Sequence, residues 1–227
     1  MPELPEVETI VRDLARLLPG ARIAAVDIIR PDLIHGESAE AFAEAMKGET
    51  IAGVRRRAKN ILLELDAPHL LAVNLGMTGR LLIRAPEDPS PSHPGVRFAL
   101  EDGRELAYHD VRRFGELRRF TAEEWSRREE ALGVEPLSGD FTAGWMGEIA
   151  GRSRVAVKSW LMDQRRVVGV GNIYASEALF RAGVDPRRPA NSLSTGETLR
   201  VVEGVRAVLE EAITFRGTTF LDYRDAR

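Results

Sequence analysis

The apolar residues of this chain change their spacing once, and that change is the strongest constraint on its fold. Between residues 22 and 120, short runs rich in Val, Ile and Leu alternate with turn-forming residues, a pattern typical of β-strands. After residue 121 the apolar residues recur at helical spacing instead. A β-rich segment followed by a helical one predicts an α+β fold of two domains, which we place at residues 1–130 and 131–227.

Individual elements can also be placed. Apolar residues from Leu4 to Leu18 recur at helical intervals, which predicts an amphipathic helix that ends at Pro19-Gly20. The strand spacing suits either a two-layer β-sandwich or a flattened barrel. Strands are predicted at residues 22–30, 50–57, 60–66, 69–75, 79–84, 96–101, 104–109 and 114–120. Further helices are predicted at 39–47, which Gly48 ends, at 121–131, with Thr121 as N-cap, and at 141–150, 153–163, 173–182 and 194–215.

Cysteine is absent from the 227 residues, which excludes disulfides, thiolate zinc sites and Cys nucleophiles together. The four His residues lie far apart and show no metal-ligand spacing, so we expect neither a metal site nor a cofactor. The first residues are acidic and no long apolar run follows them. Neither a signal peptide nor a membrane span is therefore expected, and the pattern predicts a cytoplasmic protein.

The overall charge and its distribution point in different directions. A net charge of -3 and a pI near 5.9 argue mildly against a nucleic acid as partner. The basic residues are nevertheless clustered, and a local field can outweigh the net charge. The clusters are Arg55-Arg56-Arg57 with Lys59, Arg112-Arg113, Arg118-Arg119, Arg152 with Arg154 and Lys158, and Arg165-Arg166.

The N-terminus is a candidate reagent. Met1 stands before the small residue Pro2, a context in which the initiator is normally removed to leave a secondary amine. Such an amine titrates near pH 7.7 to 8.0, roughly, and is a usable nucleophile. Its attack on an anomeric carbon gives an iminium that acts as an electron sink, and Glu3 and Glu6, within one helical turn, could transfer protons. Pro and Glu are also ordinary residues of a first helical turn, so both interpretations stay open at this point.

The opening residues Met1 to Thr9 resemble the start of the formamidopyrimidine-DNA glycosylase family, and later segments match it in the same order. This ordered set spans essentially the whole chain, and Leu4, where the endonuclease VIII branch usually carries Gly, favours the oxidised-purine branch. The matching segments are Arg56-Arg57-Ala58-Lys59, Leu75-Gly76-Met77-Thr78-Gly79, Arg112-Arg113-Phe114-Gly115, Leu161-Met162-Asp163 and the ten residues from Val168 to Glu177. The resemblance implies an N-terminal β-sandwich that carries an N-terminal helix, followed by a helical helix-two-turn-helix domain.

Carried over residue by residue, the resemblance implies catalytic roles near the N-terminus. Pro2 would be the Schiff-base nucleophile and Glu3 the proton donor to the deoxyribose during ring opening, while Glu6 stays a catalytic candidate because of its place within one helical turn of the amine. Lys59 would donate a proton or contact a phosphate beside the lesion. Without the resemblance, Lys59 would be interpreted as a solvated residue at a strand edge.

An enzyme that acts on a base must remove it from the stack and fill the space left behind. Met77, Arg112 and Phe114 resemble the residues that fill this space in the family, two as apolar wedges and Arg112 facing the orphaned base. The structural alternatives are a core position for Met77 and an inward-facing strand position for Phe114.

The glycines of Gly169 to Gly171, before a helix expected near Ile173, resemble the helix-two-turn-helix of the family. Glycines allow close approach to a phosphate, and a helix N-terminus favours an anion. Asn172 would contact the DNA backbone, or would simply be an N-cap. The resemblance adds further DNA-binding residues: His93, Arg154 and Lys158 at phosphates, and Glu177 at the sugar pocket.

Three departures from the family pattern stand out. Val111 replaces the usual Pro, and Asn74 the usual His. The family also continues beyond the segment resembling Gly217 to Tyr223 into a lesion-capping loop and a four-Cys zinc finger. This sequence ends at Arg227 without a Cys, so we expect no zinc finger here, and DNA binding that is weaker and more sensitive to salt.

The leading hypothesis is a base-excision-repair DNA glycosylase and abasic-site lyase of the bacterial nucleoid. It would act as a monomer on double-stranded DNA with an oxidised base or an abasic site, removing 8-oxoguanine and formamidopyrimidines by β,δ-elimination. The alternative is a non-catalytic or weakly active DNA-binding protein. A small-molecule enzyme that uses Pro2 as a base is a third hypothesis, which leaves Met77, Arg112 and Phe114 unexplained.

Overall fold

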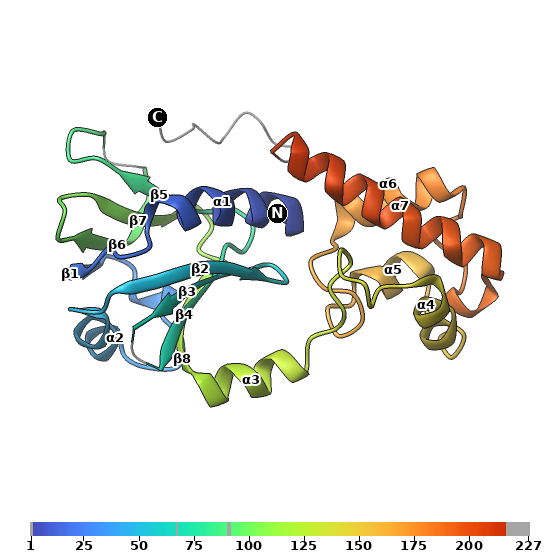
Figure 1. Ribbon diagram of the computed structural model, residues 1–227, viewed down its shortest axis with the longest axis horizontal. Helices are drawn as coiled ribbons and strands as arrows, with labels where there is room; N and C mark the ends of the chain where they lie inside the picture. Colours follow the sequence, from blue (N-terminus) through green and yellow to red (C-terminus); the bar gives the residue numbers. More distant parts are fainter. Residues whose placement is uncertain (1, 67, 90–91, 217–227) are drawn as a thin grey trace. The chain divides into compact units, whose positions relative to one another are not determined.

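The computed structural model describes residues 2–66, 68–89 and 92–216, which fall into two compact units (Figure 1). Among these residues, the β unit comprises Pro2 and residues 7–126, and the helical unit comprises residues 3–6 and 127–216. The first turn of helix α1 (Leu4–Leu17) thus belongs to the helical unit and its remainder to the β unit. The two-domain α+β fold is confirmed, whereas the bounds at residues 130 and 131 stay a prediction.

The β unit contains two four-stranded sheets whose neighbouring strands are all antiparallel. The first has the order β1-β6-β7-β5 and the second β2-β3-β4-β8. Their bounds are β1 (Ile23–Ile28), β2 (Ile51–Arg57), β3 (Asn60–Leu65), β4 (His69–Asn74), β5 (Gly79–Arg84), β6 (Pro94–Leu100), β7 (Glu105–Asp110) and β8 (Glu116–Thr121). The sequence suited either a β-sandwich or a flattened barrel. A barrel would be one closed sheet, so the two separate sheets show that this unit is a sandwich.

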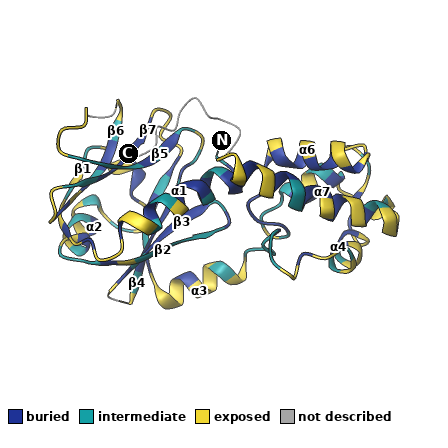
Figure 2. Cartoon of the chain, turned by 45° about the horizontal axis from the view of Figure 1, so that its top comes forward, coloured by how far each residue is buried: buried dark blue, intermediate teal, exposed yellow. Residues whose placement is uncertain are grey.

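One hydrophobic core joins the two sheets of the β unit. Leu63 of β3 and Phe98 of β6 are both buried in it, and so are Leu14 of α1 and Phe42 of α2 (Ala39–Met46). The apolar stripe of α1 recurs at three and four residues because this face of the helix packs on the core. Figure 2 shows how buried and exposed residues are distributed along the elements of this unit.

Helix α3 (Ala122–Glu130) follows β8 directly, and its start is the one predicted from the sequence. The hydroxyl of Thr121 accepts a hydrogen bond from the backbone of Glu124, and the Glu124 carboxylate accepts one from the backbone of Thr121. This reciprocal capping box satisfies two donors that a helix start leaves unpaired. Trp125 then packs edge-on against Phe120, on a small apolar cluster apart from the main core.

The helical unit has its own core, which contains Phe141, Trp160 and Leu209. Its helices α6 (Asn172–Ala182) and α7 (Thr195–Thr214) pack so closely that a Cβ at Gly204 would lie 2.8 Å from the carbonyl oxygen of Ala178, which explains a glycine inside a long helix. The remaining bounds are α4 (Ala143–Ala150) and α5 (Val157–Met162), with short 3₁₀ turns η1 (Pro31–Leu33), in the β unit, and η2 (Ala190–Ser192).

The helix predicted at residues 153–163 begins only at Val157, so its first part was wrong. The carbonyls of Ser153 and Val155 accept hydrogen bonds from Asn191 and Ala190, and Ala156 forms a bridge with Pro189. These bonds to a distant segment replace those that a helical turn would have made. Within the described residues, none of the helices combines the length and apolar character that crossing a bilayer requires.

Two phenylalanines of the helical unit provide a test of this packing. Phe141 is fully buried, whereas Phe180 is 84% exposed. Phe141→Ala should lower the free energy of unfolding by about 3–5 kcal/mol, because it removes buried surface and leaves a cavity. Phe180→Ala, the matched control, should change it by less than about 0.5 kcal/mol in the same urea titration. Equal effects of the two substitutions would contradict the core assigned here.

Candidate active site

A buried carboxylate lies next to Pro2, at the start of helix α6. Glu3 is only 1% exposed, although a carboxylate rarely occupies such a position without partners. Its Oε2 accepts hydrogen bonds from the backbone of Gly171 at 2.7 Å and of Tyr174 at 3.4 Å, and its Oε1 accepts one from Ile173 at 2.9 Å. The first N–H groups of a helix have no partner within it, so Glu3 caps α6 from a distant part of the chain.

The glycine segment before α6 makes room for the N-terminal residues. A Cβ on Gly171 would lie 2.4 Å from the carboxyl carbon of Glu3, and one on Gly169 would lie 2.7 Å from the Cβ of Leu4. Gly169 also has φ of 79°, which favours glycine, and its carbonyl accepts the backbone N–H of Leu4. The glycines therefore permit the approach of residues 3 and 4 to this loop.

Glu6 is held on both of its carboxylate oxygens. The hydroxyl of Tyr174 donates to its Oε1 at 2.6 Å, and the backbone N–H of Glu3 donates to its Oε2 at 2.9 Å. Glu3, Glu6 and Tyr174 thus form one hydrogen-bonded group in the helical unit. Sequence reasoning did not single out Tyr174, although it lies within the segment that matched the family.

Gln164 fixes the loop that leads to α6. Its side-chain amide donates to the carbonyls of Met162 and Val170, and its oxygen accepts the N–H of Gly169. The same side chain thus bonds to the loop at both ends, which holds the glycines in place. It was not predicted, because a polar residue between charged neighbours has no distinctive pattern.

Pro2 is half-buried and directly precedes this group in the chain. Met1 lies outside the described residues, so its removal stays a prediction. The residue that follows Pro2 in the chain is Glu3, whose carboxylate is held by hydrogen bonds at the start of α6.

Lys59 lies in the two-residue turn between β2 and β3, where Arg57 pairs with Asn60. It is half-buried at the tip of this hairpin, which differs from the solvated strand-edge alternative. Arg56 holds the turn: its guanidinium donates to the Ala58 carbonyl at 3.0 Å and to the Glu8 carboxylate of α1 at 2.9 Å. The turn is therefore tied to the helix that follows Pro2.

Met77 and Phe114 are surface residues on two adjoining loops. Met77 is 39% exposed and Phe114 is 58% exposed, so the core alternatives for both are wrong. Strand β8 begins at Glu116, not at residue 114, because the preceding segment forms an irregular loop. A Cβ on Gly76 would lie 2.4 Å from the carbonyl carbon of Phe114, so the loops touch through their backbones.

Arg112 completes this exposed group. Its guanidinium carbon lies 4.7 Å from the centroid of the Phe114 ring, within the range of a cation–π contact. The two departures from the family pattern lie close by. Val111 is exposed, and Asn74 accepts the N–H of Gly76 at 3.0 Å while its amide donates to Asn60 at 3.1 Å, which links the Met77 loop to the hairpin of Lys59.

The remaining predicted residues are divided between the units. His93, in the β unit, is exposed with φ of 60°, and its carbonyl accepts the N–H of Asp110. Asn172 is the exposed first residue of α6, and since Gly171 occupies the N-cap position, the capping alternative for Asn172 is wrong. In the helical unit, Arg154 and Glu177 are exposed and Lys158 of α5 is half-buried.

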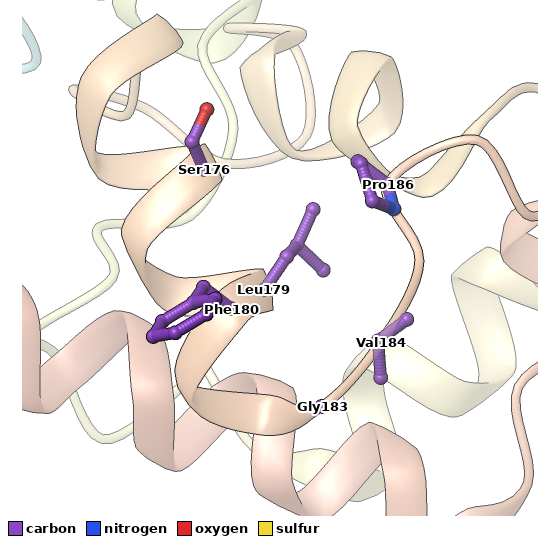
Figure 3. Close-up of a pocket in the computed structure, with 6 residues that line it drawn as sticks. All are labelled: Ser176, Leu179, Phe180, Gly183, Val184 and Pro186. Atoms are coloured by element: carbon purple, nitrogen blue, oxygen red, sulfur yellow. The ribbon is translucent and has the colours of Figure 1, made fainter.

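A pocket in the helical unit is separate from these residues. It is lined mainly by apolar groups at the end of α6 and in the following loop (Figure 3), namely Ser176, Leu179, Phe180, Gly183, Val184 and Pro186. None of these six side chains titrates or was predicted to act, so the pocket offers no chemistry. Among the described residues, no group of His, Asp and Glu could hold a metal ion.

Comparison with known proteins settles the family. The model of the formamidopyrimidine-DNA glycosylase N-terminal domain matches residues 1–117, and that of the H2TH domain of the same glycosylase matches residues 132–223. The chain belongs to the formamidopyrimidine-DNA glycosylase family. Formamidopyrimidine-DNA glycosylase of Herpetosiphon aurantiacus is 42% identical over 227 residues, which are 100% of this chain and 83% of that protein. That of Geobacillus kaustophilus is 43% identical over 98% of this chain and 82% of its own length.

Solved structures of the glycosylase family agree. Lactococcus lactis Fpg bound non-covalently to DNA containing an AP site has a TM-score of 0.89 and 28% identity, over 95% of this chain and 83% of that chain. The same enzyme with DNA containing Fapy-dG has a TM-score of 0.90 and 28% identity, over 96% and 83%. The predicted sandwich and helix-two-turn-helix architecture is thereby confirmed. The four-Cys zinc site implied by the resemblance does not fit these residues, because they include no Cys.

The ion pair that ties the Lys59 turn to α1 should make stability depend on pH. Burial alone would raise the pKa of Glu8. The hydrogen bonds and charges of Arg56 and Arg12 outweigh burial, so the pKa of Glu8 lies below its ordinary value of 4.5. A depressed pKa stabilises the folded state above about pH 4.5, and this contribution disappears as the pH falls below that value. Glu8→Gln should therefore cost on the order of 1–3 kcal/mol at pH 7 and progressively less in acid.

Urea denaturation between pH 7 and pH 3 measures this dependence. Glu44→Gln, at an exposed position of α2, is the control for the substitution itself. A deficit of the Glu8 variant that stays constant over the whole range would show that the pair with Arg56 contributes no pH-dependent stability.

Proposed function

We propose that this chain is a bifunctional DNA glycosylase of base-excision repair, which removes oxidised purines from double-stranded DNA and then cleaves the strand. Membership of the glycosylase family and its solved complexes with abasic and Fapy-dG DNA support the general activity. The observation that carries the finer proposal is Glu3, a buried carboxylate held in one orientation directly after Pro2. A nucleophile and a proton donor at consecutive residues suit glycosyl transfer to an amine.

The reaction begins with the attack of the Pro2 nitrogen on C1′ of a nucleotide that has left the stack. The bond from C1′ to the base breaks, and the base departs with the electron pair and takes up a proton. The Glu3 carboxylate takes the proton from the amine and then passes it to O4′, and the nitrogen lone pair opens the C1′–O4′ bond to give an iminium. Loss of a C2′ proton then expels the 3′ phosphate, and a second elimination expels the 5′ phosphate.

Glu6 and Tyr174 support Glu3 in this scheme. Glu6 accepts the backbone N–H of Glu3, so it fixes the main chain at the donor residue. Tyr174 donates to Glu6 and offers its own backbone N–H to Glu3, and it therefore bonds to both carboxylates. Preorganised hydrogen bonds of this kind avoid reorganisation during the reaction.

The exposed residues of the β unit suit the removal of a base from the stack. Met77 and Phe114 expose apolar surface on two adjoining loops, and Arg112 covers the Phe114 ring. We assign these three to the space vacated by the base. Arg154, Lys158, Asn172 and His93 are assigned to phosphates and Glu177 to the sugar, while Lys59 would donate a proton or contact the phosphate beside the lesion.

Borohydride trapping tests the nucleophile. Intact protein whose mass shows a free Pro2 should form a covalent adduct with a duplex that contains 8-oxoguanine or an abasic site. Protein carrying extra residues before Pro2 should form none, because its amine is blocked. Gel-shift binding of an abasic duplex without trapping or nicking would instead establish the non-catalytic DNA-binding alternative.

Lys158 allows the phosphate contacts to be tested separately. Each phosphate contact steepens the fall of log K with log salt by roughly 0.9. Lys158→Ala should therefore weaken binding to all duplexes alike and reduce the slope by about this amount. Lys47→Ala, at an exposed residue after α2 that has no assigned role, is the control. An unchanged slope in fluorescence anisotropy titrations would remove Lys158 from the DNA-binding surface.

A further inference from the structure

Asp110, the last residue of β7, is a buried carboxylate to which none of the roles above is assigned. It is 3% exposed and accepts hydrogen bonds from two different loops. Its Oδ1 accepts the hydroxyl of Thr78 at 2.5 Å and the backbone N–H of Arg112 at 3.1 Å. Its Oδ2 accepts the backbone N–H groups of Phe114 at 3.0 Å and Gly115 at 2.9 Å, and the hydroxyl of Tyr108 at 3.3 Å.

These bonds converge on the loops that carry the exposed group of Met77, Arg112 and Phe114. Thr78 follows Met77 directly, and its hydroxyl also accepts the N–H of Arg112 at 3.1 Å. A single carboxylate therefore joins the loop after β4 to the loop after β7. All the atoms concerned belong to the β unit.

The loop backbones leave little alternative space around this carboxylate. A Cβ on Gly115 would lie 1.7 Å from the hydroxyl of Tyr108, and one on Gly79 would lie 2.4 Å from the same atom. Gly76 and Arg113 both have φ of 55°, a conformation that costs a non-glycine residue such as Arg113 about 1–2 kcal/mol. Such backbone persists only where surrounding contacts determine it.

The exposed side chains cannot supply those contacts. Met77 and Phe114 bury too little surface to hold their loops by the hydrophobic effect, which scales with the apolar area removed from water. Several backbone N–H groups on one carboxylate supply them instead, since charge-assisted hydrogen bonds are stronger than neutral ones. Burial acts to raise the pKa of Asp110, but the Thr78 hydroxyl and the loop N–H groups lower it below its ordinary value, so the side chain is ionised at neutral pH.

We propose that Asp110 is a positioning residue that sets Met77, Arg112 and Phe114 into one rigid wedge before DNA is bound. The inference rests on the proposed function, because the wedge acts only on a base pair. Ordering a loop on binding costs conformational entropy. Loops that are already ordered by folding avoid this cost, so the wedge enters the duplex without it. Asp110 thus governs the removal of the base from the stack, and leaves the reaction at Pro2 unaffected once a sugar is accessible.

The experiment compares two substrates and one measurement without DNA. Asp110→Asn keeps the shape of the side chain but turns an NH₂ group toward N–H donors. With 2-aminopurine beside an 8-oxoguanine in a duplex, the fluorescence rise that reports unstacking should slow roughly 10- to 100-fold. Cleavage of an abasic site in a single strand, which needs no unstacking, should stay within about twofold of the parent protein. In the free protein, amide hydrogen exchange at Arg112, Phe114 and Gly115 should become faster.

Two further variants separate positioning from a general loss of stability. Thr78→Val removes one donor and should give smaller changes of the same kind, and it carries the test if Asp110→Asn does not fold. Asp102→Asn, at the exposed turn between β6 and β7 where the carboxylate accepts hydrogen bonds from Arg104, should change none of the measurements.

The outcomes distinguish this inference from the function on which it rests. Unchanged hydrogen exchange, or faster exchange with unstacking at the parent rate, overturns the role of Asp110 even if the parent protein is fully active. Equal losses on the duplex and the single strand also overturn it, because a wedge does not act on an unpaired strand. A parent protein that cleaves neither substrate refutes the proposed function, and a role for Asp110 in unstacking is refuted with it.

Discussion

The capping of α6 by the Glu3 carboxylate is the interaction on which the candidate chemistry depends. A carboxylate that is only 1% exposed needs hydrogen-bond partners within the protein. The backbone N–H groups of Gly171, Ile173 and Tyr174 are these partners, so the Glu3 side chain fixes their positions. The same carboxylate also requires glycine at position 171, because a Cβ there would collide with Glu3. The Glu3 side chain is therefore held in one orientation at the start of α6.

Asp110 solves the same problem in the β unit. Glu3 and Asp110 are both buried carboxylates that accept backbone N–H groups, Glu3 from the start of α6 and Asp110 from the loop after β7, and in both places glycines let the main chain come close. A helix start or a loop can offer such N–H groups, because its backbone donors are not all paired within a helix or a sheet. The fold thus keeps its regular elements for the two cores and orders its loops with buried acids.

Most of the fold followed from local patterns. The predicted strands correspond to the observed ones because short runs of Val, Ile and Leu between turn-forming residues match strands such as β3, β4 and β7, which are buried at most positions. The failures share one cause. Residues 153–156 bond to residues 189–191, and Phe114 is pulled into a loop by Asp110, so distant hydrogen bonds decided both. Asn172 failed as a cap because Glu3 had already occupied that role from the other end of the chain.

The same division explains which site residues the sequence could offer. Pro2, Met77 and Phe114 were open to prediction because a reactive amine or an exposed apolar residue has a recognisable chemical type or a place in a family segment. Asp110 and Gln164 act through hydrogen bonds to backbone atoms, for which almost any neighbouring sequence serves. Their roles exist only in three dimensions. Because groups that react must be held by groups that do not, a site inferred from residue types alone contains its reagents but lacks the contacts that orient them.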